Sequence, residues 1–555
     1  MVSRTRRRLG RTSLLASATV LAATGLAPVA ADAAPSTLQP PPARAALQAR
    51  AGATGAPSLR SKDPGVMANL FEWNWPSVAA ECSTVLGPAG FGGVQVSPPQ
   101  DSLKRTAEDQ ADPNTGAVTV RHPWWEVYQA VDYSLTSRMG SEQQFKDMAS
   151  TCRKAGVKVY VDAVINHTVG QGHVSYGGQT YDKPLYDQPA VPYTRENFHV
   201  PQGECPTTGG VDDFNNIKQV TNCDLVGLHD LRTQTPYVRG TLAAYLNTLL
   251  GYGVSGFRVD AAKHVGQTDL DAIYARLDKT KDGTKPYWAL EVFGGGPGSL
   301  SPEAFTSSGT VLGLDGVKQI RDAFNSYTAA HEGSIATLKD FGEDSGLTPS
   351  GRTLSFVQNH DTERNGDALS YKVGARNTLA TEWLLASGYG TPQVYSGFTW
   401  DAPDPSTLPP NATNDDKSGN AASPPSDDEG MVRDTDCTPG QGWACTDRNP
   451  GVLAMVGWHN YVGDRARHRW YDDGENVIAF NRGNRGWVAF NNNQQGAKTI
   501  TVKTGMKKGT YCDIIHGGLK SGRCSGPTVR VSGSGRATVT IKALDTVAFT
   551  KLDRV

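Results

Sequence analysis

The stretch Gly256-Phe257-Arg258-Val259-Asp260-Ala261-Ala262-Lys263-His264 has the pattern of a buried strand that runs into a loop. Phe257 and Val259 are residues that favour a strand. Arg258 and Asp260 interrupt this apolar setting, and a buried charge costs free energy unless it is paired, bound to an ion or used in catalysis. Taken alone, the two residues are explained by a structural ion pair, so the rest of the chain must decide between these interpretations.

Apolar strand patterns recur along the chain and are separated by helical patterns, an alternation typical of a parallel sheet. About eight such units favour a closed (β/α)₈ TIM barrel, an α/β fold, over an open doubly wound sheet. A G-x-G-x-x-G motif does not follow the early strands, which argues against a dinucleotide-binding fold. The expected strands are Val66–Glu72, Gly92–Val96, Val157–Val164, Val254–Val259, Tyr287–Val292, Thr310–Leu314, Leu354–Gln358 and Gln393–Tyr395.

Changes of composition divide the chain into domains. Residues 166–231 are rich in Gly, Pro, Tyr and Asp and are too long for a simple strand-to-helix loop, so we expect an irregular subdomain inserted after the third strand. The barrel then comprises residues 64–165 and 232–465. Short strand patterns between Gly and Asn turns predict an antiparallel β-sandwich at 466–555. Residues 401–436, dense in Pro, Ser, Asn and Asp, predict a long surface loop.

The N-terminus has the features of an export signal. A basic region is followed by a short apolar run and by the small-x-small pattern Ala31-Asp32-Ala33, which predicts a signal peptide at 1–33. Residues 34–63 are rich in Ala, Pro and Gly and predict a disordered lead-in or pro-segment. The formal net charge is -1 for the whole chain and becomes -5 without residues 1–33, with 49 basic and 54 acidic residues. We therefore expect a secreted protein that binds neither nucleic acid nor membrane.

Eight cysteines in an exported chain indicate disulfides. Sequence alone allows 105 pairings for eight cysteines. Proximity along the chain favours three local pairs, Cys205–Cys223, Cys437–Cys445 and Cys512–Cys524, and leaves Cys82 with Cys152. A C-x-x-C zinc spacing does not occur in the sequence.

Polar residues gather at the ends of the expected barrel strands, where barrel enzymes place their active sites. The third strand runs into Asp162-Ala163-Val164-Ile165-Asn166-His167, the fourth carries Asp260, the fifth carries Glu291, and the seventh runs into Asn359-His360-Asp361. The chain has no G-x-S-x-G nucleophile elbow. Three carboxylates without a nucleophilic Ser or Cys indicate acid/base chemistry on a glycosidic or similar bond.

These motifs resemble, in order and spacing, the four main signature regions of the α-amylase family of glycoside hydrolases. The matching segments are Asp162–His167, Gly256–His264, Glu291-Val292 and Phe356–Asp361. Further segments resemble the animal-type branch of the family, which also occurs in bacteria; they are Leu70–Trp73, Gly90–Pro99, Trp124–Gln129, Gly483–Gly486 and Gly509–Asp513. The resemblance runs from about residue 64 to the end of the chain and implies the same barrel, insertion and C-terminal β domain.

The resemblance implies that Asp260 is the nucleophile and Glu291 the general acid and base. Asp361 matches a third carboxylate that grips sugar hydroxyls. The apolar strand around Glu291 should raise its pKa, and Arg258 should keep Asp260 ionised. A retaining mechanism needs the two carboxyl groups about 5–5.5 Å apart. The implied reaction is endo-hydrolysis of α-1,4-glucosidic bonds in starch, glycogen and maltooligosaccharides.

The resemblance also implies contacts to sugar on both sides of the cleaved bond. Outside the motif, a Trp pair is more often part of a core and an isolated His is more often structural. The matching residues are Trp124, Trp125, Tyr128, Gln129, His167, Arg258, Lys263, His264 and His360.

Two ions belong to the family pattern. The side chains of Asn166 and Asp230 and the backbone carbonyls of Thr221 and His264 match a structural calcium site, and oxygen-only ligation suits Ca²⁺. Animal-type members often bind chloride through two arginines and an asparagine. Arg258 and Asn359 match two of these residues, but Gln393 stands at the second arginine position. A neutral amide removes one positive charge, so we expect activity that does not depend on chloride.

Two alternatives remain open on the sequence. The first is a transglycosylase, or a maltooligosaccharide-forming relative on the same scaffold, which analysis of the products would separate. The second is a non-catalytic glucan-binding protein, which would not require all of Asp260, Glu291 and Asp361. A monomer is expected.

Overall fold

The structure is a computed structural model, and it describes residues 65–107, 122–182, 186, 193–325, 333–401 and 422–555. The predicted signal peptide at 1–33 and lead-in at 34–63 lie outside the described residues, as does most of the loop predicted at 401–436.

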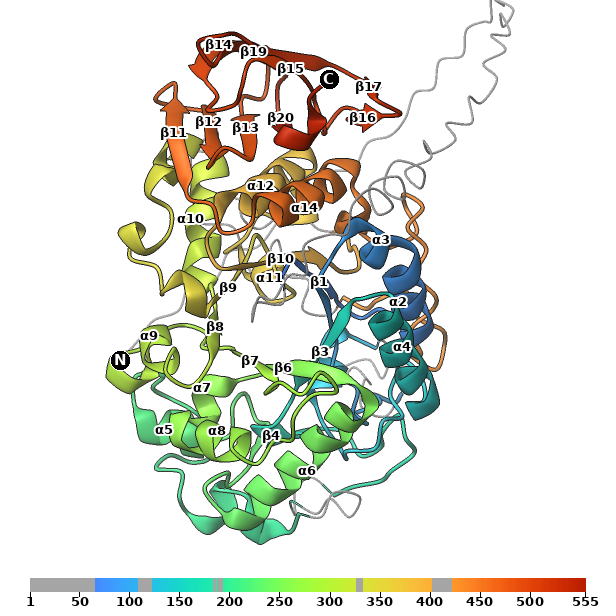
Figure 1. Ribbon diagram of the computed structural model, residues 1–555. Helices are drawn as coiled ribbons and strands as arrows, with labels where there is room; N and C mark the ends of the chain where they lie inside the picture. Colours follow the sequence, from blue (N-terminus) through green and yellow to red (C-terminus); the bar gives the residue numbers. More distant parts are fainter. Residues whose placement is uncertain (1–64, 108–121, 183–185, 187–192, 326–332, 402–421) are drawn as a thin grey trace, which may run out of the picture. The chain divides into compact units, whose positions relative to one another are not determined.

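Eight parallel strands close into a barrel, in the order β1-β10-β9-β8-β7-β6-β3-β2 (Figure 1). This confirms the predicted (β/α)₈ architecture. Each of the eight predicted strand patterns became one barrel strand, with ends shifted by at most two residues. The strands are β1 (Met67–Leu70), β2 (Gly93–Val96), β3 (Lys158–Ala163), β6 (Val254–Val259), β7 (Tyr287–Leu290), β8 (Thr310–Leu312), β9 (Thr353–Phe356) and β10 (Thr391–Ser396).

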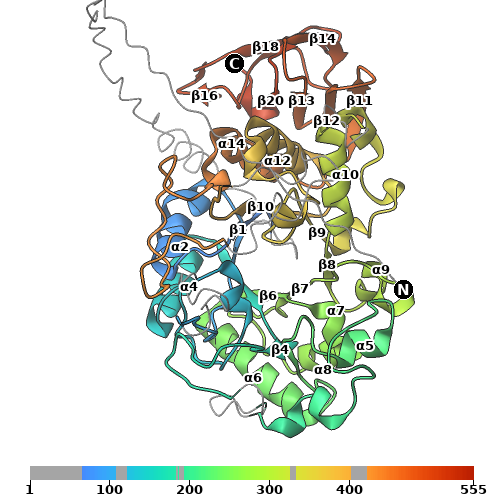
Figure 2. The ribbon, with the colours of Figure 1, turned by 180° about the vertical axis from the view of Figure 1, so that it is seen from behind.

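Helices follow the barrel strands and cover the sheet (Figures 1 and 2). The helix α4 (Glu142–Lys154) begins with a capping box, in which the side chains of Ser141 and Gln144 bond each other's backbone N–H groups. The helices of the described chain are α2 (Trp75–Glu81), α3 (Gly87–Ala89), α4 (Glu142–Lys154), α5 (Ile217–Asn222), α6 (Pro236–Tyr252), α7 (Ala262–Val265), α8 (Gln267–Tyr274), α9 (Pro302–Phe305), α10 (Leu314–Phe324), α11 (Thr362–Asn365), α12 (Ala375–Ser387) and α14 (Pro450–Val462).

The chain between β3 and α6 has little regular structure. It contains the helix α5 and one short antiparallel pair, β4 (His167–Thr168) with β5 (His229–Asp230). Backbone hydrogen bonds hold this insertion to the barrel, for example from Val169 N to Ala130 O at 2.9 Å. The domain boundaries proposed at 166 and 231 remain predictions.

The C-terminal part is an antiparallel β domain. One sheet has the order β11-β12-β13-β20, and the pairs β14–β19, β15–β18 and β16–β17 complete the domain. Its apolar side chains, among them Trp487, Val539 and Phe549, form a core of their own. The strands are β11 (Arg467–Asp472), β12 (Val477–Arg482), β13 (Gly486–Asn491), β14 (Lys498–Lys503), β15 (Gly509–Cys512), β16 (Leu519–Lys520), β17 (Arg523–Cys524), β18 (Thr528–Val531), β19 (Arg536–Ile541) and β20 (Asp545–Thr550).

All four predicted disulfides are present, which confirms the pairing. They are Cys82–Cys152, Cys205–Cys223, Cys437–Cys445 and Cys512–Cys524, with Cα–Cα distances of 4.9 to 5.8 Å. Within the described ranges, no helix is long and apolar enough to cross a membrane.

Candidate active site

The guanidinium of Arg258 lies at the C-terminal end of β6 and contacts carboxylates from neighbouring strand ends. Its Nη1 donates hydrogen bonds to Asp162 Oδ1 at 2.7 Å and to Asp260 Oδ1 at 2.8 Å. Its Nη2 donates to Glu291 Oε1 at 2.5 Å and lies 3.9 Å from Asp361 Oδ2. Arg258 is 2% exposed, so water screens these interactions little. The three predicted catalytic carboxylates therefore converge on one buried cation.

The backbone turn after β6 fixes two of these carboxylates. Asp260 N donates to Ala163 O at 3.0 Å, which ties the end of β6 to β3. Ala261 then adopts a left-handed conformation with φ +47°, and its N–H donates to Glu291 Oε2 at 2.9 Å. A left-handed Ala is strained, and such strain is often stored at functional sites. The turn thus holds both oxygens of Glu291, one through Arg258 and one through the backbone.

Burial raises the pKa of Asp260, Glu291 and Asp361, and it raises that of Asp162 to about 7. The charge of Arg258 acts in the opposite direction on all four groups. The expected rise for Glu291 is present. For Asp260 burial is the largest cause of the rise, and Arg258 opposes it through its charge and its hydrogen bond, which is the direction expected of Arg258. The four carboxyl groups interact strongly and titrate as a set that shares protons.

Asp361 precedes α11, so a helix cap is the simplest alternative role for it. The structure gives that role to Asn359, whose Oδ1 accepts from Thr362 N at 2.8 Å and from Asp361 N at 3.1 Å. The Asp361 side chain makes no capping bond to α11 and lies 3.2 Å from His360 Nε2. It is 27% exposed, which leaves it accessible to a ligand.

An aromatic wall stands beside the carboxylates. Tyr128 OH donates to Asp162 Oδ2 at 2.9 Å and lies 2.9 Å from His360 Nε2. The His360 ring stacks on Phe71, with ring centroids 4.5 Å apart, and its burial holds its pKa well below the usual range. His360 is therefore neutral. Trp124 packs against Tyr128 and His360 and is only partly buried.

Three other predicted sugar contacts are His167, Gln129 and Trp125. His167 Nε2 lies 3.1 Å from the Tyr128 carbonyl, and burial lowers the pKa of His167 to about 4. Gln129 is buried and accepts a hydrogen bond from Gly170 N at 3.1 Å, which gives it a structural role. The guanidinium of Arg105 lies 5.3 Å from the ring centre of Trp125, which is partly exposed.

Two exposed aromatic residues near Lys263 escaped the sequence analysis. Lys263 Nζ donates to Gly295 O at 2.5 Å and lies 5.9 Å from the ring centre of Phe214. Phe214 is 47% exposed and Phe293, two residues after Glu291, is 41% exposed. Exposed aromatic side chains beside a site are candidates for stacking on sugar rings. Phe293 could have been found from its place beside the Glu291 motif, whereas the sequence around Phe214 gives no such signal.

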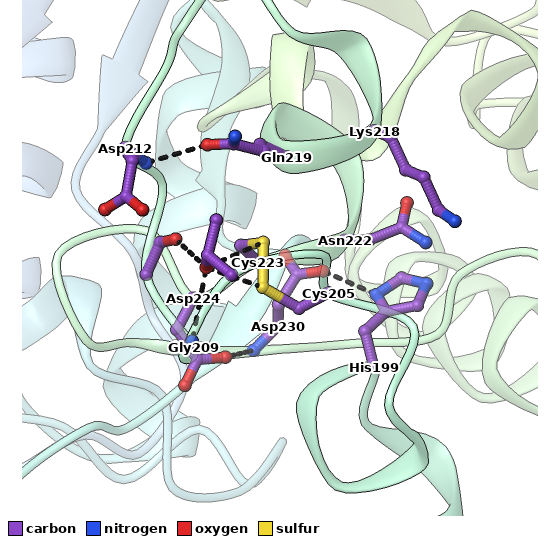
Figure 3. Close-up of a disulfide and its surroundings, with 12 residues drawn as sticks. His199, Cys205, Gly209, Asp212, Lys218, Gln219, Asn222, Cys223, Asp224 and Asp230 are labelled. Carbon is purple, nitrogen blue, oxygen red and sulfur yellow. Dashed lines mark hydrogen bonds and ion pairs between the residues drawn. A yellow bond between two sulfur atoms is a disulfide. The ribbon is translucent and has the colours of Figure 1, made fainter.

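The candidate calcium residues lie where the insertion meets the barrel. Asn166 Nδ2 contacts Asp230 Oδ1 at 3.0 Å, and His199 Nδ1 lies 2.5 Å from Asp230 Oδ2. Figure 3 shows His199 beside Asp230, near the Cys205–Cys223 disulfide. His264 Nδ1 lies 2.8 Å from the carbonyl of Val220, the residue before Thr221.

This donor set fits calcium. In the part of the chain that the structure describes, no group of three or more His, Cys, Asp or Glu side chains is arranged for a metal ion. The matching residues offer amide, carboxylate and carbonyl oxygens, which are ligands that Ca²⁺ accepts. Asp230 is 1% exposed and burial raises its pKa to about 7, so a divalent cation would stabilise its ionised form. Rotation of the Asn166 side-chain amide by half a turn would direct its oxygen, in place of its nitrogen, toward the ion.

The residues that match a chloride site make hydrogen bonds within the protein. Gln393 Nε2 donates to Gln95 Oε1 at 2.9 Å, and both side chains are buried. Asn359 Oδ1 is used to cap α11. Both terminal nitrogens of Arg258 already contact carboxylates, which would repel an anion.

Comparison with known proteins identifies the family. Residues 121–285 match the profile of the α-amylase catalytic domain, and residues 470–551 match that of the α-amylase C-terminal all-β domain. The chain is 40% identical over 505 residues to an α-amylase of Thermomonospora curvata, covering 90% of this chain and 75% of that one. It is 37% identical over 489 residues to an α-amylase of Tribolium castaneum, covering 87% and 92%.

Solved structures agree with this relationship. The crystal structure of α-amylase I from Eisenia fetida superimposes with a TM-score of 0.79 at 33% identity, covering 88% of this chain and 97% of that chain. A mutant of the same earthworm enzyme has been solved in complex with maltohexaose and superimposes equally well.

Proposed function

This chain belongs to the α-amylase family of glycoside hydrolases, and from this premise we propose that it cleaves internal α-1,4-glucosidic bonds of starch, glycogen and maltooligosaccharides with retention of configuration. The observation that carries the proposal is the convergence of Asp260, Glu291 and Asp361 on the guanidinium of Arg258. A site built only to bind neutral glucan would not need three carboxylates around one cation. The alternative of a non-catalytic glucan-binding protein is therefore set aside.

In the proposed first step, the Asp260 carboxylate attacks the anomeric carbon while Glu291 gives its proton to the glycosidic oxygen. The bond between the anomeric carbon and that oxygen breaks, and the leaving chain departs with a free hydroxyl group. In the second step the Glu291 carboxylate takes a proton from water, which attacks the anomeric carbon and releases Asp260. Two inversions restore the α configuration. Asp361 and the neutral His360 grip sugar hydroxyls during both steps.

We assign the sugar contacts by position around these carboxylates. Trp124, Trp125 and Tyr128 form the wall on one side, and His167 and His264 lie near the cleavage point with pKa values lowered to about 4, so both are neutral hydrogen-bonding groups. Lys263, Phe214 and Phe293 lie close to one another, and we assign the leaving chain to this group. We further propose that the protein is exported and acts as a monomer; four disulfides support export, since such bonds persist in oxidising compartments.

The test is the hydrolysis of a maltooligosaccharide of defined length. We expect internal cleavage and products that appear first as the α anomer, which NMR or polarimetry can follow. Products with the β configuration would contradict the role of Asp260 as a nucleophile. If the main products are longer than the substrate, the result would favour the transglycosylase alternative instead.

Calcium removal should destabilise the protein. The side chains of Asn166 and Asp230 and the carbonyls of Thr221 and His264 would hold Ca²⁺ between the insertion and the barrel. An ion present at about 100 times its Kd stabilises the folded state by about 2.7 kcal/mol. We expect a chelator to lower Tm by several degrees and calcium to restore it, as measured by calorimetry.

A pair of variants makes this test specific. Asp230→Asn should have a lowered Tm that no longer responds to calcium, whereas Asp213→Asn, an exposed residue of the same insertion, should respond like the wild type. A Tm that the chelator leaves unchanged in the wild type would contradict the calcium assignment.

Chloride should have no effect on the rate. Because Gln393 bonds Gln95 and carries no charge, we expect equal kcat values with chloride and with an inert anion in its place. Gln393→Arg supplies the missing positive charge and should create stimulation by chloride of about twofold or more. Gln393→Met, of similar length and without charge, is the control and should stay indifferent. A wild type that needs chloride would refute this proposal.

A further inference from the structure

One segment of the C-terminal domain, residues 498–542, is strongly basic, although the whole chain has a formal net charge of -1. Between Lys498 and Lys542 the sequence contains nine basic residues and one acidic residue, Asp513. Asp513 is buried and contacts His516, so it does not neutralise the charge of this segment. The basic residues, all exposed, are Lys498, Lys503, Lys507, Lys508, Lys520, Arg523, Arg530, Arg536 and Lys542.

Strand alternation places part of this charge on one surface, which we call the basic face. In β14, β18 and β19 every second residue is buried in the core of the domain, and the residues between are exposed. β14 pairs with β19 (Figure 1), and β18 lies beside β19. The outward residues are either basic or hydroxylated. They are Thr499, Thr501, Lys503, Thr528, Arg530, Ser532, Arg536, Thr538, Thr540 and Lys542.

The hydroxyl groups are arranged in rungs across the strand pair. Thr499 Oγ1 lies 2.9 Å from Thr540 Oγ1, and Thr501 Oγ1 lies 2.9 Å from Thr538 Oγ1. Each rung leaves unused donor and acceptor capacity on its outer side, because a hydroxyl offers one donor and two acceptors. The rungs therefore present a flat polar surface between the flanking cations.

The charge of the basic face opposes the stability of the sheet. Lys503 stands directly opposite Arg536 in the strand register, and both side chains point outward. Like charges directly opposite in an antiparallel pair are destabilising. Arg536 Nη2 donates to Thr501 O at 2.9 Å, which holds its guanidinium over the sheet. An unfavourable pair of this kind is expected where an anionic partner supplies the compensating charge.

The same face lacks the side chains that bind neutral glucan by stacking. Tyr511 is the one Phe, Trp or Tyr residue in the sequence from 498 to 542, and it is 1% exposed. Stacking needs an exposed ring. A partner that recognises this face must therefore offer negative charge and hydrogen-bonding groups.

We propose that the basic face of the C-terminal domain binds α-glucan that carries phosphate monoesters, with the cations on phosphate and the threonine rungs on sugar hydroxyls. This inference rests on the proposed function, because the glucan backbone is taken from the substrate of the barrel. It assigns the C-terminal domain the role of holding the enzyme on phosphorylated regions of an insoluble substrate.

The test compares binding of the full-length protein to phosphate-rich starch granules and to the same granules after phosphatase treatment, measured in the cold by sedimentation. We expect binding to the phosphorylated granules to be about fivefold tighter or more, and the difference to shrink as salt is raised. The variant is Lys503→Glu combined with Arg530→Glu. Lys503→Glu places a glutamate opposite Arg536, which favours the native pairing and guards against misfolding.

The control variant is Lys279→Glu combined with Lys281→Glu, which changes the net charge equally at exposed positions before β7. The phosphate preference should vanish in the first variant and persist in the control. Equal binding of the wild type to both kinds of granule, or equal losses in both variants, would overturn the proposal. Heparin and phosphorylated glucan are also compared as competitors at the same concentration of charge. If heparin displaces the protein from the granules as effectively as phosphorylated glucan does, the proposal is overturned in favour of general polyanion binding.

A separate readout distinguishes this failure from failure of the proposed function. Hydrolysis of a neutral, soluble maltooligosaccharide uses the barrel alone and should be equal in the wild type and both variants. Absence of that hydrolysis in the wild type would contradict the proposed function, whatever the granules show.

Discussion

Glu291→Gln should lower kcat on a maltooligosaccharide by about 10³-fold or more, while the affinity for the sugar changes little. A glutamine keeps the volume of the side chain and can still accept the hydrogen bond from Arg258, but it cannot give a proton to the leaving oxygen. General acid catalysis contributes about 10²–10⁴-fold, and the loss of the same group as a base in the second step adds to the effect. Steady-state kinetics and titration calorimetry measure the two quantities.

A substrate with a good leaving group separates the two proposed roles. An α-maltosyl fluoride needs little help from an acid, so Glu291→Gln should recover much of its first-step rate on it, whereas Asp260→Asn should stay inactive on both substrates. Glu382→Gln removes an equally buried carboxyl group on α12 and should keep normal activity. Equal losses on both substrates for Glu291→Gln would contradict its role as an acid.

The pH profile gives a second check on the same residue. Burial raises the pKa of Glu291, so its acid form persists to higher pH than that of an exposed carboxyl group. Activity should fall as pH rises through this pKa, because the acid is lost. It should also fall as pH drops and Asp260 becomes protonated. With the fluoride substrate and Glu291→Gln, the alkaline fall should disappear while the acid fall remains.

The fold followed from the sequence where the apolar pattern was long and periodic. All eight barrel strands were predicted, since a strand buried on both faces leaves a continuous apolar run such as β6. In the C-terminal domain the strand patterns predicted only the strands that became β12, β13, β14, β18 and β19, so β11, β15, β16, β17 and β20 were missed. β11 carries Arg467-His468-Arg469-Trp470-Tyr471-Asp472, in which polar residues hide the strand pattern and a register shift interrupts the pairing. β20 pairs only with β13 in its sheet, a partner more than fifty residues away along the chain.

The site followed from motifs, but its electrostatics did not. The motifs placed Asp260, Glu291 and Asp361 at neighbouring strand ends, and the structure brings them to one guanidinium. Sequence suggested one ion pair between Arg258 and Asp260. It could not show that Asp162 shares the same cation, since that contact depends on the barrel closing β3 beside β6. Nor could the sequence show how completely Asp260 is buried, and this burial raises its pKa against the effect of Arg258.

Arg258→Met should abolish activity and should destabilise the fold in a pH-dependent way. Methionine fills a similar volume, but it leaves Asp162, Asp260 and Glu291 buried without their cation. Breaking a buried ion pair by removing one partner costs about 3–5 kcal/mol. Because the lowering effect of Arg258 is lost, the folded-state pKa values of the three carboxyl groups should rise further. Denaturant unfolding measured from acid to alkaline pH would quantify the loss.

The sign of this pH dependence follows from the direction of those shifts. A carboxyl group whose pKa is raised in the folded state makes its full contribution to the free energy of unfolding below its unfolded pKa, which is about 4. This contribution is lost as pH rises above that value. The deficit of Arg258→Met should therefore be small near pH ~4 and largest at neutral and alkaline pH. Arg482 is an equally buried arginine, but it donates to the carbonyls of Ala386 and Gly463. Arg482→Met should lose stability by a similar amount from acid to neutral pH, since carbonyls do not titrate and burial lowers the pKa of Arg482 only to about 10. A pH-independent deficit in Arg258→Met would show that Arg258 acts through packing, and the shared-cation account of the site would then be wrong.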